Sequence, residues 1–270
     1  MAYLARDARR VYFEDHRPPG SGSTAVVLVH GWGMGVRCWD HVVPALVDAG
    51  QRVVLFDHRG CGRSDKDFAD MGIGAIAGDL VALVETLELD GVLLNGWSLG
   101  GAVVVEAAAR LGARVRALVL TGGATPAYVQ KPDFPHGGSR DDMAQTLAAL
   151  AADRVNFLHG LSKVVCAREV GVQIEDWLYR IFLEASPLAG ATLGELADLD
   201  QREQLLALDL PLLSFIGSAD GFVAPDIGRW VGEHHPRAQI VEYEGVGHAP
   251  FIEEREAYLE RLVEFTEAHL

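Results

Sequence analysis

Residues 92–101 read VLLNGWSLGG, and AVVVEAAAR follows them at residues 102–110. The apolar first half predicts a short buried strand, and the Ala- and Val-rich run predicts a helix. A sharp strand-to-helix turn between them would hold Ser98 in a strained backbone conformation, with its hydroxyl exposed above the edge of a sheet. Gly96 and Gly100 fit this turn, because side chains there would collide across it. The alternative interpretation is a glycine-rich turn that merely starts a helix.

The rest of the chain alternates short apolar runs with amphipathic stretches, as in a mostly parallel sheet covered by helices on both faces. Apolar residues from Ile73 to Leu87 recur at helical spacing and predict one crossover helix. Residues 10–16 are predicted to form an antiparallel strand at the edge of the sheet. The other expected strands are residues 25–30, 52–57, 92–95, 116–121, 211–217 and 239–243.

The alternation breaks between residues 123 and 208. This segment opens with a Pro- and Gly-rich loop and continues in a helical pattern with no strand-like run. Loops of this length inside a compact domain usually carry their own structure or a function. We therefore predict an α/β core of residues 1–122 and 209–270, with residues 123–208 inserted as a helical cap or lid.

A serine nucleophile needs a base, and histidine is the usual one because it titrates near neutrality. His248 lies in GVGHAP, between the last predicted strand and the last helix, where a loop could bring it over Ser98. His30 ends a strand and precedes a glycine-rich turn, whereas His234 and His235 close a helix and are expected at the surface. We therefore predict that His248 is the base.

The base in turn needs an acceptor that fixes its tautomer. Asp220 directly follows the strand at residues 211–217 and is predicted to be this acid. In some hydrolases the acid follows the preceding strand, but Gly122 and its neighbours offer no carboxylate there. Asp226 is the fallback acid, although its place at a helix start is better explained as a favourable N-terminal charge.

An oxyanion formed during acyl transfer needs two backbone donors. The N–H of Leu99, directly after the nucleophile, is one predicted donor of this oxyanion hole. The other is the N–H of Trp32, in the turn HGWG at residues 30–33.

The segments HGWG, DHRGCGRSD, GWSLGG, SADGFVAP and GHAPFIE resemble signatures of the α/β-hydrolase family in order and spacing. Within the family they are similar to the pimeloyl-acyl-carrier-protein methyl ester carboxylesterases and to the non-haem haloperoxidases and arylesterases. The resemblance implies an α/β-hydrolase fold, with a mostly parallel sheet flanked by helices and an inserted helical cap. It also implies a serine hydrolase with a Ser98–His248–Asp220 catalytic triad. Relatives that use an aspartate nucleophile are excluded by Ser98.

The expected reaction is hydrolysis of a carboxylic ester with a small-to-medium apolar acyl group, through an acyl-enzyme. The same triad leaves open C–C bond hydrolysis, lactonase or perhydrolase activity, and a non-catalytic ligand receptor is the remaining alternative. We place Trp32, Trp97, Leu99 and Phe157 along the substrate pocket. Trp97 has a second possible place in the core beneath the turn, and Phe157 lies where the resemblance places an acyl channel.

Composition limits the partners. A formal charge of −15 over 270 residues argues against nucleic acid, which needs a basic face. Three widely separated cysteines indicate neither disulfides nor a metal site, and no cofactor is expected. We expect a cytoplasmic protein without a membrane partner, because neither a signal peptide nor a long apolar run is found. The resemblance leaves an acyl-carrier protein open as a partner, which no other feature supports.

Overall fold

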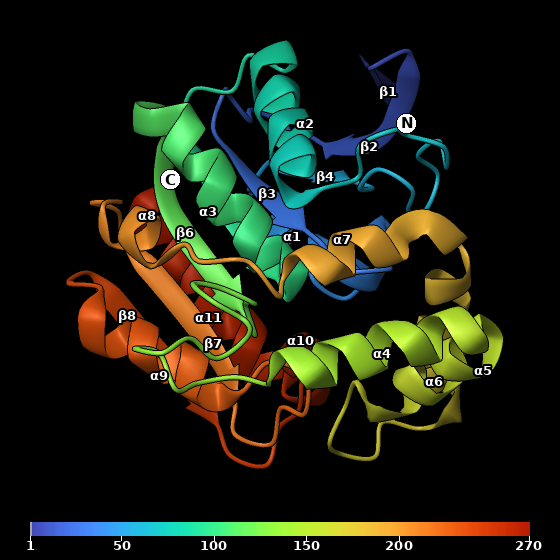
Figure 1. Ribbon diagram of the computed structural model, residues 1–270. Coiled ribbons are helices and arrows are strands. Elements are labelled where there is room, and N and C mark those ends of the chain that lie inside the picture. Colours follow the sequence, from blue (N-terminus) through green and yellow to red (C-terminus); the bar gives the residue numbers. More distant parts are fainter. Residues whose placement is uncertain (1) are drawn as a thin grey trace.

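The computed structural model describes residues 2–270, and eight strands of this range form one sheet (Figure 1). The strand order is β1-β2-β4-β3-β5-β6-β7-β8. The pairs β1–β2 and β2–β4 are antiparallel, and all later pairs are parallel. The strands are β1 (Ala2–Arg6), β2 (Arg9–His16), β3 (Ala25–Val29), β4 (Val53–Phe56), β5 (Val92–Trp97), β6 (Val115–Thr121), β7 (Leu212–Gly217) and β8 (Ala238–Tyr243).

Helices cover both faces of the sheet. One buried apolar cluster joins the sheet to α2, α3 and α9, and a second joins the opposite face to α1 and α11. The helices are α1 (Val43–Asp48), α2 (Ile73–Thr86), α3 (Leu99–Leu111), α4 (Arg140–Ala152), α5 (Arg154–Val164), α6 (Val172–Leu183), α7 (Gly190–Glu195), α8 (Arg202–Leu206), α9 (Pro225–His234), α10 (Pro250–Glu253) and α11 (Arg255–His269), with short 3₁₀ turns at Val36–Trp39, Gly112–Arg114 and Pro187–Ala189.

The central strand β3 shows why the strands read as continuous apolar runs. Val27 and Val29 pack toward α2 and α3, whereas Val26 and Leu28 pack into the cluster on the α11 face, and all four are fully buried. Burying one such side chain stabilises the fold by about 1.5–3 kcal/mol relative to leaving it exposed. Both faces of the strand therefore require apolar residues.

The strands expected from the apolar runs are confirmed, but the edge of the sheet was predicted wrongly. Residues 10–16 lie in β2, which is an inner strand, because β1 pairs with its outer side. A two-residue turn joins β1 and β2, and both of its residues, Asp7 and Ala8, have positive φ values of 50° and 59°. Alanine seldom adopts such a conformation, so residues 7 and 8 are not recognisable as a hairpin turn from their residue types.

The segment 123–208 contains α4–α8 and supplies none of the eight strands. Its first part is a loop held by the isolated bridges Val129–Gly138 and Lys131–Phe134. In Figure 1, α4, α5 and α6 lie beyond the end of the sheet toward which the parallel strands point. Ligands bind at this end of open α/β sheets.

Candidate active site

Ser98 occupies the turn between β5 and α3. Its backbone has φ 56° and ψ −124°, a positive-φ conformation that is rare for residues other than glycine. The N–H of Ser98 donates to the carbonyl of Thr121 at 3.1 Å, and the Ser98 carbonyl accepts from Gly101 and Ala124, both at 2.8 Å. These bonds fix the strained turn to the end of β6, as a sharp strand-to-helix turn requires.

The two glycines that flank Ser98 are required by close backbone approaches. A Cβ on Gly96 would lie 2.3 Å from the carbonyl oxygen of Gly100, so the predicted collision across the turn is confirmed. A Cβ on Gly100 would instead lie 2.4 Å from the carbonyl oxygen of Val29 in β3. Gly100 therefore brings α3 against the neighbouring strand.

His248 and Asp220 form a hydrogen-bonded pair at the ends of β8 and β7. The Nδ1 atom of His248 lies 2.7 Å from Oδ2 of Asp220, and the two side chains are 5% and 2% exposed. The other carboxylate oxygen of Asp220 accepts from the N–H groups of Phe222, at 2.7 Å, and Val223, at 3.0 Å. Because a carboxylate accepts, Nδ1 carries the proton and Nε2 is left as the basic nitrogen.

Gly122 lies directly beside this pair. It has φ 49°, and a Cβ there would be 3.2 Å from Nδ1 of His248 and 3.3 Å from Oδ2 of Asp220. This is the position at which some hydrolases carry the acid. The side chains of His248 and Asp220 therefore leave little room for a side chain at residue 122.

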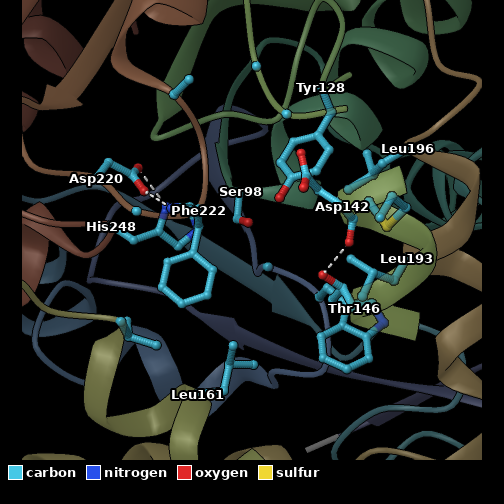
Figure 2. Close-up of a pocket in the computed structure, with 18 of the residues that line it drawn as sticks. Ser98, Tyr128, Asp142, Thr146, Leu161, Leu193, Leu196, Asp220, Phe222 and His248 are labelled. Carbon is cyan, nitrogen blue, oxygen red and sulfur yellow. Dashed lines mark hydrogen bonds and ion pairs between the residues drawn. The ribbon is translucent and has the colours of Figure 1, made fainter. Parts of the chain in front are cut away.

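Ser98, Asp220 and His248 line one cavity of about 620 Å³ between the sheet and the segment 123–208. Figure 2 shows the Ser98 hydroxyl in the cavity, with His248 and Asp220 to one side of it and Tyr128 and Asp142 to the other. Mainly apolar side chains complete the wall. They include Met34, Phe157, Leu161, Val165, Phe182, Leu193 and Leu196.

The competing histidines lie elsewhere. His30 is fully buried, its Nδ1 donates to the carbonyl of Gly31 at 2.7 Å, and its Nε2 accepts from the N–H of His58 at 2.9 Å. The two rings stack with centroids 3.7 Å apart, and burial lowers the pKa of His30 to about 4. His30 is thus neutral, and its ring joins the ends of β3 and β4 through hydrogen bonds.

His234 is exposed as expected, but the expectation for His235 was wrong. His235 is 3% exposed, and its Nε2 lies 2.9 Å from the carbonyl oxygen of Leu208, which satisfies the buried ring. The fallback acid Asp226 pairs with Arg229 at 2.6 Å on α9 and does not line the cavity.

Three of the four expected substrate contacts line the cavity, and Leu99 does not. Trp32 and Phe157 line the cavity, and Trp32 Nε1 donates to the carbonyl of Ala189 at 2.8 Å. Trp97 reaches the cavity but is 2% exposed, and its Nε1 donates to the carbonyl of His248 at 2.8 Å beneath the turn. Leu99 was predicted wrongly as a side-chain contact, because the first turn of α3 directs its side chain into the core, where it is 1% exposed.

Tyr128 and Asp142 line the cavity opposite Ser98 and were not among the residues predicted from the sequence. Burial and the charge of Asp220 raise the pKa of the Tyr128 phenol to about 12. Asp142 belongs to an S-x-x-D capping box that opens α4. The capping signal could have located the helix start, but it does not tell which side chains face a cavity.

No group of three or more His, Cys, Asp or Glu side chains within residues 2–270 could hold a metal ion. The three cysteines are free and buried, and burial raises the pKa of the Cys61 thiol to about 12. A helix long and apolar enough to cross a membrane is likewise absent from this range.

Residues 24–255 match the family model of the alpha/beta hydrolase fold. A pimeloyl-[acyl-carrier protein] methyl ester esterase of Sodalis glossinidius (strain morsitans) is 31% identical over 257 residues, which cover 92% of this chain and 95% of that protein. An esterase from Exiguobacterium antarcticum has a similar structure, with a TM-score of 0.93 and 26% identity over 98% of both chains. A bromoperoxidase from Bacillus anthracis gives a TM-score of 0.89 and 28% identity over 96% of both chains.

Proposed function

Because the chain belongs to the alpha/beta hydrolase fold family, we propose that it is a serine hydrolase that cleaves carboxylic esters with small-to-medium apolar acyl groups. One observation carries the proposal. The pair of His248 and Asp220, 2.7 Å apart, shares a cavity with a serine held at positive φ on a strand-to-helix turn. The combination of a strained serine, a base and an orienting acid suits nucleophilic acyl transfer.

In the proposed reaction the Ser98 oxygen attacks the ester carbonyl while Nε2 of His248 takes the hydroxyl proton. The tetrahedral intermediate then expels the alcohol, which receives that proton from His248. Water attacks the acyl-enzyme by the same route, releasing the acid and restoring the Ser98 hydroxyl. Asp220 holds the tautomer and stabilises the imidazolium throughout.

We further propose that the backbone N–H groups of Leu99 and Trp32 bind the oxyanion. Leu99 is the first residue of α3, whose N-terminal end carries a partial positive charge. The turn before Trp32 passes close to the nucleophile, since a Cβ on Gly31 would lie 3.0 Å from Cβ of Ser98. One such donor typically stabilises the transition state by about 2.7–4 kcal/mol.

Residues 123–208 are proposed to act as a cap that selects the substrate, while residues 1–122 and 209–270 carry the chemistry. The proposed triad and both proposed oxyanion donors lie outside the cap. Phe157 and Leu161 of α5 and Phe182 of α6 supply part of the apolar wall above Ser98. An apolar wall with a few polar groups suits an acyl chain whose carbonyl is held at one point.

A second candidate is peracid formation at the same serine. The bromoperoxidase likeness, at a TM-score of 0.89, favours it as an alternative. Hydrogen peroxide would attack the acyl-enzyme in place of water, releasing a peracid and free Ser98. Peracid release from acetate and peroxide, compared with p-nitrophenyl acetate hydrolysis, would separate the two activities.

The decisive test is pre-steady-state release of p-nitrophenol from p-nitrophenyl butyrate. We expect a burst equal to the enzyme concentration, with the butyryl group found by mass spectrometry on the peptide that contains Ser98. Ser98→Ala should abolish the burst and lower kcat about 10⁴-fold or more. Ser23→Ala, which changes an exposed serine, should give the same burst and the same kcat as the parent protein. A burst that survives in Ser98→Ala would refute the proposal.

A further inference from the structure

The cavity wall opposite Ser98 carries a carboxylate in a fixed orientation. Oδ2 of Asp142 accepts from both the N–H and the hydroxyl of Ser139, at 2.8 and 2.7 Å, and the N–H of Asp142 donates back to that hydroxyl at 3.0 Å. These bonds hold the pKa of Asp142 below its usual range, so the group is charged at neutral pH. Oδ1 accepts no hydrogen bond from residues 2–270.

The charges around the cavity have one sign. Among the described lining residues there is no lysine or arginine, and the other carboxylate, Asp220, is paired with His248. Asp142 is therefore the one lining charge without an ionic partner in the described part of the chain. The whole chain carries a formal charge of −15, which reinforces a negative potential at this mouth.

Asp142 lies across the cavity from Ser98, on a wall that also carries apolar side chains (Figure 2). Figure 2 shows Leu193 and Leu196 beside Asp142, and Leu161 of α5 also lines the cavity. A substrate whose carbonyl sits at Ser98 and whose chain crosses the cavity would bring its far end to the wall formed by α4. The chemical group at that far end would then face the Oδ1 atom of Asp142.

We propose that Asp142 determines substrate charge, so that the site favours esters with a cationic group at the far end of the chain and disfavours esters that end in a free carboxylate. This inference rests on the proposed esterase function and adds the substrate class. Asp142 is solvent exposed, so the interaction is partly screened and its effect is moderate. We expect a change of about three- to tenfold in relative kcat/KM, which shrinks as salt is added.

The test uses three p-nitrophenyl esters of equal acyl length. They are hexanoate, hexanoate with a terminal trimethylammonium group, and the adipate monoester with its free carboxylate. In Asp142→Asn the cationic-to-neutral ratio of kcat/KM should fall about three- to tenfold and the anionic-to-neutral ratio should rise, both at low salt. The same differences should become smaller at high ionic strength.

Two control variants separate the proposal from other causes. Asp141→Asn removes the same charge from an exposed neighbour that does not line the cavity, and it should leave both ratios as in the parent. Ser139→Ala breaks the capping box but keeps the carboxylate, so the cationic ester should remain preferred.

The outcomes distinguish the two proposals. Ratios in Asp142→Asn that equal those of the parent, or that change equally in Asp141→Asn, would overturn the role of Asp142 while leaving Ser98-dependent hydrolysis intact. If the parent protein cleaves none of the three esters, the proposed function fails and this inference fails with it.

Discussion

The N–H of His248 donates to the carbonyl of Val165 at 2.9 Å, which ties the loop of the proposed base to the segment between α5 and α6. Glu253 also joins the His248 loop to the segment between α5 and α6. Its carboxylate accepts from the N–H of Gly247, at 2.9 Å, and from those of Ala167 and Arg168, at 2.8 and 2.9 Å. A movement of the proposed cap at this point would therefore displace His248.

Glu253→Gln should lower kcat about 10- to 100-fold with a smaller change in KM. An amide offers one acceptor oxygen for N–H groups on two segments, so the His248 loop loses its fixed position. Glu254→Gln is the matched control, because Glu254 binds the Arg168 side chain and not Gly247. Equal kinetic losses in both variants, measured where their circular dichroism matches the parent, would contradict the positioning role.

Asp220→Asn should reduce kcat by about 10⁴-fold, because the amide favours the wrong tautomer of His248. Asp226→Asn removes the same charge from α9, where Asp226 pairs with Arg229, and should retain most activity. Steady-state kinetics of both variants on one ester show which aspartate is the acid that orients His248. The assignment of the acid is wrong if Asp226→Asn is the more damaging substitution.

Phe157→Ala should change the ranking of acyl chains, because it enlarges the apolar wall of the cavity. We expect shifts of about 1–3 kcal/mol per mismatched group in relative kcat/KM across a chain-length series. Val155→Ala, on the same helix but 55% exposed, should leave the ranking unchanged. A uniform loss on all esters would mean that Phe157 only packs the helices of the segment 123–208.

Acid should destabilise the protein through His30. Burial lowers its pKa from an ordinary value of 6.5 to about 4, so the unfolded chain takes up a proton first and stability falls as the pH drops from about 6.5 toward about 4. The full loss from this residue is about 3 kcal/mol. The measurement is urea unfolding at a series of pH values.

His30→Gln should make the free energy of unfolding depend less steeply on pH in this range. The slope should fall by an amount that corresponds to about one bound proton. Some slope should persist, because burial also lowers the pKa of His58. The exposed His234→Gln variant provides the control. An unaltered slope in His30→Gln would show that His30 does not account for the acid sensitivity.

The places of Ser98, Asp220 and His248 could be predicted because each follows a strand of a mostly parallel sheet. Carboxyl ends of such strands meet at one edge, so the strand pattern alone brings these residues together. Their proposed chemical roles rest on residue type and on the resemblance to known hydrolases.

Side-chain direction could not be predicted in the same way. Leu99 lies beside the nucleophile, yet the start of α3 buries its side chain in the core. Burial of His235 depends on an acceptor at Leu208, which is distant in sequence. Tyr128 and Asp142 reach the cavity because of how the loop and α4 pack against the sheet, and neither periodicity nor capping signals encode that packing.

Gly122 limits how this site could have changed during evolution. Moving the acid from the end of β7 to the end of β6 would place a side chain at residue 122. The Cβ of that side chain would lie 3.2 Å from Nδ1 of His248 and 3.3 Å from Oδ2 of Asp220. An ancestor with both carboxylates would crowd two like charges against one imidazole, and an ancestor with neither would leave that imidazole without an orienting acceptor. Moving the acid would therefore require both a substitution at residue 122 and the loss of Asp220, and we expect either change alone to weaken the orientation of His248.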